Sequence, residues 1–266
     1  MSADLLSWLP LLAKLLLTAG IVVTASVVAE RVGPLTGALV ATLPVTVWPA
    51  YVFLSIDHDA VFVAEAARSG LAINAVTGAF LLVYATLAQK RGLLVCFFAA
   101  VGCWIAFAVL ARSIAWTLAT ASLLNLIIYP ACLWFGRALG TAEMPRLRRA
   151  WYDLPMRTLL VCALMATILE VSTWAGPAVT GLLAVYPISS TSLMLILQPR
   201  IGGRAAAAVM ANSLWGLLGI SVGLAALSFS VVPFGAVPAL AAALAIPIVW
   251  NLTVWTIRRR DALALK

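Results

Sequence analysis

Charged residues are scarce in this sequence. Asp, Glu, Lys and Arg together make up 10% of its 266 residues, whereas 64% of the residues are hydrophobic. About a quarter of the residues in a soluble domain are charged, and a soluble domain of this length could not bury so much apolar surface. The composition therefore excludes an ordinary soluble domain.

Residues and motifs on which enzymes depend are also scarce. The only histidine, His58, stands between Asp57 and Asp59 in an expected loop; it can be read as a proton or metal site or, more simply, as part of a solvated loop. The sequence has no His, Cys and acidic cluster with metal-ligand spacing and no serine-hydrolase, zinc-protease or phosphate-binding glycine motif. We therefore expect no enzyme activity, no cofactor and no metal. The four cysteines all lie in apolar stretches and are typical of small core residues: Cys96, Cys103, Cys132 and Cys162.

Long apolar stretches take up most of the chain. Each is about 20 residues long, the length that a helix needs to cross the hydrocarbon core of a bilayer. The pattern predicts an all-α integral membrane protein with about nine transmembrane helices, ten remaining open. The expected spans are 5–29, 35–56, 61–88, 93–111, 114–135, 158–175, 177–197, 205–228 and 233–257.

A sequence repeat organises these spans. Residues 33–44 and 176–187 both begin with Gly-Pro and end with proline at the same spacing, 143 positions apart. Self-similarity of this kind indicates duplication. We therefore expect a first repeat of five spans at 1–136, a basic linker at 137–156, and a second repeat at 157–266 with four spans or a short fifth near 217–232. Further matched pairs are Lys14 with Arg157, Thr46 with Ser189, and Asn74 with Asn212.

The distribution of basic residues predicts the orientation of the chain. If nine spans are assumed and the linker is cytoplasmic, fourteen of the 17 basic residues lie on the cytoplasmic side, and only Lys14, Arg68 and Arg112 lie outside. This bias is typical of membrane proteins and explains the net charge of +8 without nucleic acid. It places the N-terminus outside and the C-terminus in the cytoplasm, with the two copies inverted relative to each other.

Two prolines predict breaks in helices 2 and 7. Pro44 and Pro187 lie about ten residues into their spans, near the bilayer midplane, where each removes a backbone donor and displaces a carbonyl. Such a break is tolerated where it packs on protein or lines a watery cavity. Nearby hydroxyls are expected to cap half-helices whose amino ends bind a polar or anionic group. Alternatively, they only compensate for hydrogen bonds that are lost at a proline kink. The candidate solute-binding residues are Thr42, Pro44, Thr46, Trp48, Pro187, Ser189, Ser190 and Thr191.

Other polar residues within spans are candidates for the site. Asn74 and Asn212 either line the path of the solute or form hydrogen bonds that hold neighbouring helices together. Lys14 and Arg157, one near each face, either extend to the interface or attract anions and gate the path. Glu170 is expected to be the most embedded acid and so a candidate for proton coupling. Several aromatic residues are expected to be interface anchors: Trp48, Tyr51, Trp104, Trp116, Trp174, Trp250 and Trp255.

Two segments carry a resemblance to a known family. Residues Leu35-Thr36-Gly37-Ala38-Leu39-Val40-Ala41-Thr42-Leu43-Pro44 and Ala211-Asn212-Ser213-Leu214-Trp215-Gly216 resemble stretches of small GlpM-type bacterial inner-membrane proteins. The resemblance covers about two spans per copy. It implies a bacterial inner-membrane location and no particular activity.

These features predict a secondary transporter that moves a small polar or anionic solute by alternating access, because inverted repeats with broken helices are similar to the general plan of such proteins. Alternatives are a non-transporting scaffold or lipid-handling subunit that acts with a partner, or a channel. The expected partners are a small-molecule solute and membrane lipid, with no nucleic acid. A homodimer remains open.

Overall fold

The computed structural model describes residues 3–32, 46–142 and 150–264, which contain helices and no strand. The expected all-α class is therefore confirmed for these parts of the chain. The helices are α1 Ala3–Val32, α3 Val47–Asp57, α4 Ala60–Leu87, α5 Leu93–Ala111, α6 Leu118–Gly136, the short 3-10 helix η1 Leu139–Thr141, α7 Asp153–Ser172, α8 Gly176–Ala184, α9 Ile188–Phe234 and α10 Ala236–Ala264.

Six helical segments within the described residues are long and apolar enough to cross a membrane, which indicates a multi-pass membrane protein. They are α4, α5, α6, α7, the Gly176–Phe234 segment, and Ala236–Arg258 of α10. Shorter apolar stretches occur in α1 and α3, at Leu9–Thr24 and Val47–Asp57. The expected spans 61–88 and 93–111 coincide with α4 and α5.

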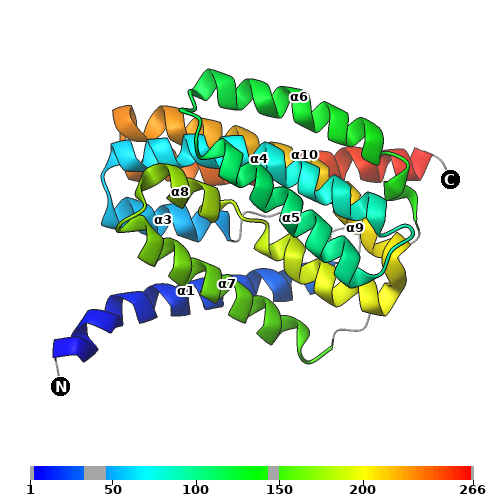
Figure 1. The fold of residues 1–266 in the computed structure, drawn as a ribbon, viewed down its shortest axis with the longest axis horizontal. Coiled ribbons are helices and arrows are strands. Elements are labelled where there is room, and N and C mark those ends of the chain that lie inside the picture. Colours follow the sequence, from blue (N-terminus) through cyan, green and yellow to red (C-terminus); the bar gives the residue numbers. More distant parts are fainter. Residues whose placement is uncertain (1–2, 33–45, 143–149, 265–266) are drawn as a thin grey trace.

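The centre of the molecule is formed by α4 and the second part of α9, which pack against each other, with α10 on α9 and α6 on α4 (Figure 1). The most apolar stretch of α4 is 67% buried, against 22% for those of α5, α6 and α7. The outer helices direct large apolar side chains away from the protein, among them Phe98, Leu126 and Leu159. Such a surface suits lipid rather than water.

The chain between residues 198 and 204 is a kink and not the loop that the sequence predicts. Helical structure continues on both sides of Gly202, whose φ of 82° and ψ of 163° are the non-helical values within α9. Glycine adopts this backbone conformation without steric cost. A Cβ on Gly203 would collide with the carbonyl of Ala88, so α9 passes very close to the end of α4.

The predicted helix break at Pro187 is present, since α8 ends at Ala184 and α9 begins at Ile188. Its expected counterpart at Thr42 and Pro44 lies outside the described residues. The alternative of a short re-entrant segment near 217–232 is wrong, because α9 continues as helix through these positions to Phe234.

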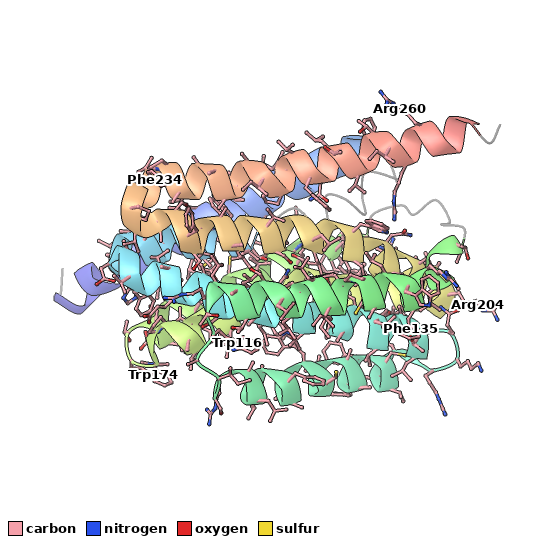
Figure 2. All side chains as sticks on the ribbon, turned by 90° about the horizontal axis from the view of Figure 1, so that it is seen from above. Trp116, Phe135, Trp174, Arg204, Phe234 and Arg260 are labelled. Carbon is pink, nitrogen blue, oxygen red and sulfur yellow. The ribbon has the colours of Figure 1, made fainter. Side chains whose placement is uncertain are left out.

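The start of α1 and the end of α10 lie at opposite ends of the helical bundle (Figure 1). Figure 2 shows Trp116, Trp174 and Phe234 at the end near the start of α1, and Phe135, Arg204 and Arg260 at the other. Which end faces the cytoplasm remains a prediction from the charge bias.

Candidate functional site

The interruption between α8 and α9 is packed inside the protein. Val185 and Pro187 are buried, and the Tyr186 amide donates to the Leu183 carbonyl at 3.0 Å. Gly181 of α8 lies directly on the Ala66 backbone of α4, where a Cβ would collide with the Ala66 carbonyl. Close backbone approach through a small residue is typical of helix packing in membranes, and it holds the break against the central helix.

The hydroxyls after the break do not cap α9, so this expectation is wrong. The Thr191 hydroxyl donates to the Pro187 carbonyl at 2.8 Å, and the Ser192 hydroxyl donates to the Ser189 carbonyl at 2.8 Å. These carbonyls lie within the first turn of α9, and the Pro187 carbonyl also accepts the Thr191 amide at 2.8 Å. The two hydroxyls therefore form ordinary bonds within the helix and do not replace the donor that the proline removes. No side-chain bond caps the start of α9, and none caps the start of α3 at Thr46.

Ser189 and Ser190 differ from these neighbours. Both are half-buried, and neither hydroxyl bonds another residue in the described part of the chain. Within the first turn of α9, the Ile188 amide donates to the Tyr186 carbonyl at 2.7 Å and the Thr191 amide to the Pro187 carbonyl at 2.8 Å. The helix therefore begins inside the protein with only the Ser189 and Ser190 amides unpaired in the described part of the chain, beside the two unengaged hydroxyls. Such a helix start carries a partial positive charge and suits a polar or anionic group.

Aromatic residues that the sequence suggests as interface anchors line the surroundings of the break instead. Trp104 of α5 is 5% exposed and packs edge to face against Tyr186, with ring centroids 4.8 Å apart. Its indole nitrogen donates to the Thr77 hydroxyl at 3.3 Å. Tyr51 is fully buried and donates to the Ala66 carbonyl at 3.0 Å. Trp48 is half-buried against the same core.

Asn74 belongs to a buried polar network that joins α4, α6 and α9. Its amide nitrogen donates to the Leu217 carbonyl at 3.1 Å and to the Ser221 hydroxyl at 2.8 Å. Ser221 donates in turn to Asn125 Oδ1 at 2.9 Å, and Tyr129 donates to the Asn74 carbonyl at 2.9 Å. Asn74 Oδ1 is buried and has no hydrogen-bond partner, so one acceptor remains unused in the core.

Asn212, which the repeat pairs with Asn74, lies in different surroundings. Its amide nitrogen donates to the Gly140 and Ala208 carbonyls at 3.2 and 2.9 Å, and its oxygen accepts from Arg258 Nη1 at 2.8 Å. The structure therefore does not bring the two asparagines together. Both tie helices to their neighbours, which is the interhelical role that the sequence leaves open.

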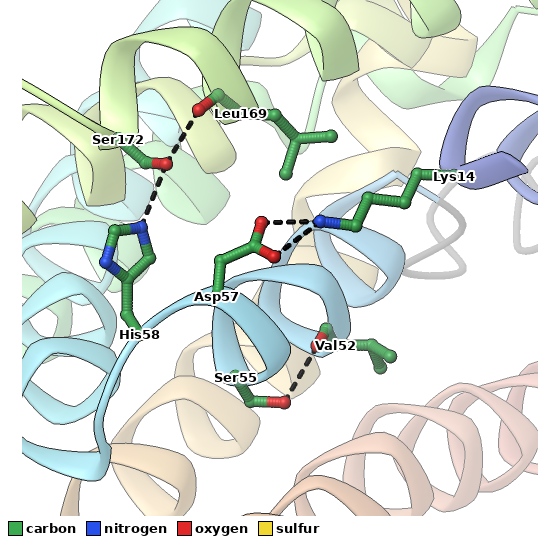
Figure 3. A network of polar contacts seen from close by, with 7 residues as sticks. All are labelled: Lys14, Val52, Ser55, Asp57, His58, Leu169 and Ser172. Atoms are coloured by element: carbon green, nitrogen blue, oxygen red, sulfur yellow. Dashed lines mark hydrogen bonds and ion pairs between the residues drawn. The ribbon is translucent and has the colours of Figure 1, made fainter. Parts of the chain in front are cut away.

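Lys14 is not a free cation. Its ammonium group binds both carboxylate oxygens of Asp57 at 2.6 Å (Figure 3). The neighbouring residue His58 stacks on Phe62 at 3.9 Å and shares a hydrogen bond of 3.0 Å with Ser172 at the end of α7. The corner between α3 and α4 is thereby attached to both α1 and α7.

The other charged candidates are placed differently. Arg157 lies in the second turn of α7, because this helix begins at Asp153 and not after the expected linker, and its Nε is buried without a partner. Asp153 binds Arg200 Nη1 at 2.7 Å. Glu170 is exposed on the surface of α7, two residues before the helix ends at Ser172, and its proposed part in proton coupling stays a prediction.

These features define a multi-pass helical membrane protein with an interrupted helix and a buried polar network in its core. Within the described residues, no group of His, Cys, Asp and Glu could hold a metal ion. No family model matches the sequence, and neither a curated protein nor a solved structure matches it.

Proposed function

We propose that the protein is a secondary transporter of the bacterial inner membrane, which moves a small polar or anionic solute by alternating access. The observation that carries the proposal is the buried interruption between α8 and α9 at Pro187. Non-helical backbone at membrane depth is retained only where protein or a watery cavity serves it. In secondary transporters, solutes bind at such interruptions.

The packing of the central helices supports an inverted repeat. The Ser228 hydroxyl of α9 donates to the Ala64 carbonyl at the start of α4, and Gly203 at the other end of this part of α9 lies against Ala88. The two helices therefore run antiparallel, and the repeat makes them equivalent. Equivalent helices run in opposite directions when the symmetry axis lies in the membrane plane. This agrees with the proposed topology, with the N-terminus outside and the C-terminus cytoplasmic.

The proposed solute site lies at the start of α9. The hydroxyls and backbone amides of Ser189 and Ser190 would bind the polar or anionic group, and Trp104 and Tyr186 would cover its apolar part. The unused Asn74 oxygen would accept a donor. Thr42 and Pro44 belong to the proposed set from the sequence repeat alone, since they lie outside the described residues. The proposed set thus keeps Thr42, Pro44, Thr46, Trp48, Asn74, Pro187 and Thr191; Asn212 is left in its structural role.

A ligand screen by thermal stability tests the proposal. The purified protein would be heated in detergent with carboxylates, phosphates, sugars, amino acids and lipids, because a ligand that binds the folded state raises its apparent stability. We expect one class of small polar solute to raise the melting temperature and S189A/S190A to lose that rise. T253A is the matched control, because the Thr253 hydroxyl is exposed and bonds only within α10.

The hits would then be tested for counterflow in proteoliposomes. Solute exchange that S189A/S190A abolishes and T253A retains supports a transporter. Stabilisation by lipid or by a co-purifying protein alone, with no solute exchange, would instead support a scaffold or lipid-handling subunit. Ion conductance without counterflow would support a channel. Either of these last results overturns the proposal.

A further inference from the structure

Two ion pairs occupy corresponding places in the two copies. In the first copy Lys14 of α1 binds Asp57 at the end of α3 at 2.6 Å. At the second copy, Arg200 of α9, just before the kink at Gly202, binds Asp153 at 2.7 Å. Asp153 falls in the expected linker 137–156 but begins α7, the first helix of this copy. Each pair joins the first helix of a copy to the far end of the helix that follows the proline.

The two ion pairs lie at corresponding positions of the chain, but the charges at these positions differ. Asp57 and Arg200 stand 143 positions apart, and the same offset relates Lys14 to Arg157. Two arginines at the second place would repel each other. There the carboxylate comes from Asp153, which precedes Arg157 by about one helical turn on α7. The bridge is kept although the signs of its two ends are exchanged.

The two pairs lie at opposite ends of the bundle. Asp153 is the first residue of α7 and Ser172 is its last, about 30 Å apart for a helix of 20 residues. Ser172 bonds His58, the residue next to Asp57 (Figure 3). The Lys14–Asp57 pair is therefore at the Ser172 end of α7, and the Asp153–Arg200 pair is at its other end.

Both pairs are partly withdrawn from solvent. The exposed fractions of the side chains are 17% for Lys14 and 34% for Asp57, and 21% for Arg200 and 17% for Asp153. Losing one partner of such a pair leaves the other charge poorly hydrated. Each bridge therefore resists separation of its helices until water reaches both charges, which is the behaviour required of a gate.

We propose that the two ion pairs are the two gates of alternating access, and this inference rests on the proposed transport function. Lys14–Asp57, with His58–Ser172 beside it, closes the path at one end, and Asp153–Arg200 closes it at the other. Both gates are closed in this structure. Opening one end separates α1 and α7 from the α3–α4 corner, and opening the other separates α7 from α9.

Side-specific labelling of a cysteine in the core tests the gates without a solute. The variant S190C would be made in a background with C96A, C103A, C132A and C162A and placed in vesicles of known orientation. Its reaction with a membrane-impermeant maleimide would be timed from each side. K14Q and D57N should raise the labelling rate from one side, and D153N and R200Q from the opposite side. The expected change is about fivefold, which corresponds to about 1 kcal/mol of lost pairing.

Matched variants separate gating from a general loss of stability. The charge exchanges K14D/D57K and D153K/R200D should return the labelling rate to its starting value. E65Q is the control, because Glu65 forms a longer ion pair of 3.7 Å with Arg68 within α4. Labelling should be unchanged in this variant.

The proposal is overturned if both sets of variants raise labelling from the same side, or if none changes it. If neutral variants fail to fold, K14C/D57C and D153C/R200C would be joined with a short thiol crosslinker in the same background. Each crosslink should abolish labelling of S190C from its own side only; loss of labelling from both sides contradicts separate gates. The labelling experiment tests the gates, and counterflow tests transport. If labelling responds from opposite sides but no solute shows counterflow, the transport proposal fails and the proposed gates stand, so the two failures are distinguishable.

Discussion

Asp57 and Arg200, which stand at corresponding positions of the two copies, each bind an oppositely charged residue on the first helix of their own copy. The offset in the sequence relates these two positions, and at each of them an ion pair joins the corresponding helix segments although the charges are exchanged. The consequence for Lys14 and Arg157 is an asymmetry. Lys14 is neutralised by Asp57, whereas Arg157 Nε is buried without a partner. Of the two proposed cationic attractors of anions, Arg157 is therefore the better candidate.

The Lys14–Asp57 pair should contribute measurably to stability. A double-mutant cycle with K14Q and D57N, followed by thermal unfolding in detergent, should give a coupling free energy of about 0.5–1 kcal/mol. The coupling should fall with added salt, because both side chains are partly solvated. The Glu65–Arg68 pair, 3.7 Å apart and more exposed, should give a coupling near zero. Equal couplings for the two pairs would contradict the importance of burial.

Gly181 should tolerate no side chain. In G181A the new Cβ would collide with the Ala66 carbonyl of α4 and push α8 away, at a cost of about 1–3 kcal/mol. G102A is the matched control, since no atom lies within 4 Å of the corresponding Cβ position in α5. This control should be neutral or slightly stabilising, because alanine favours helix over glycine. Thermal unfolding of both variants measures the difference, and equal melting temperatures would contradict the close α4–α8 contact.

The sequence predicts the helices well where local chemistry determines them. The expected span 93–111 agrees with α5 at both ends, because Gly92 and Arg112 bound an uninterrupted apolar stretch. The break at Pro187 is predicted from the loss of a helical donor at proline, but Pro130 and Pro247 lie inside α6 and α10, so the residue type alone does not decide where a helix ends. The kink at Gly202 is missed, since a Gly-Gly pair beside Pro199 is typical of a loop; the close approach of Gly203 to Ala88 depends on tertiary packing that the local sequence does not reveal.

The roles of individual side chains are predicted less well. In a helix that is apolar all round, hydropathy does not distinguish the face toward lipid from the face toward protein. Trp104 is therefore expected at the interface although it lies in the core of the protein. The Thr191 hydroxyl donates to the Pro187 carbonyl and does not accept from a backbone amide at the start of α9. Which partner the hydroxyl has depends on the side-chain rotamer. These outcomes follow from tertiary packing.

Ser221 should matter more to stability than its buried neighbour Ser213. S221A removes the hydroxyl that accepts from Asn74 and donates to Asn125, so two buried amide groups lose a partner. The cost should be about 1 kcal/mol, as for other interhelical hydrogen bonds in membranes. S213A removes only a bond to the Val209 carbonyl of the same helix and should be nearly neutral. Thermal unfolding compares the two variants, and a larger loss in S213A would show that the network is not a tie between helices.

Trp104 should be among the most sensitive positions around the helix break. W104A removes a ring that packs against Tyr186 and the indole group that donates to Thr77, and it leaves a cavity between α5 and the start of α9. The loss should be about 3–5 kcal/mol, the usual cost of truncating a buried tryptophan. W174A is the control, because Trp174 is 72% exposed and an anchor at the surface has little protein to lose. Thermal unfolding and the response to a stabilising solute would be measured for both variants.

The conservative variant W104F should regain most of the stability, because a phenyl ring still fills the space. It should leave the Thr77 hydroxyl without its donor. If W174A lowers stability more than W104A does, Trp104 is not a packed part of the core. The proposed solute site then loses the apolar side that Trp104 and Tyr186 are proposed to form.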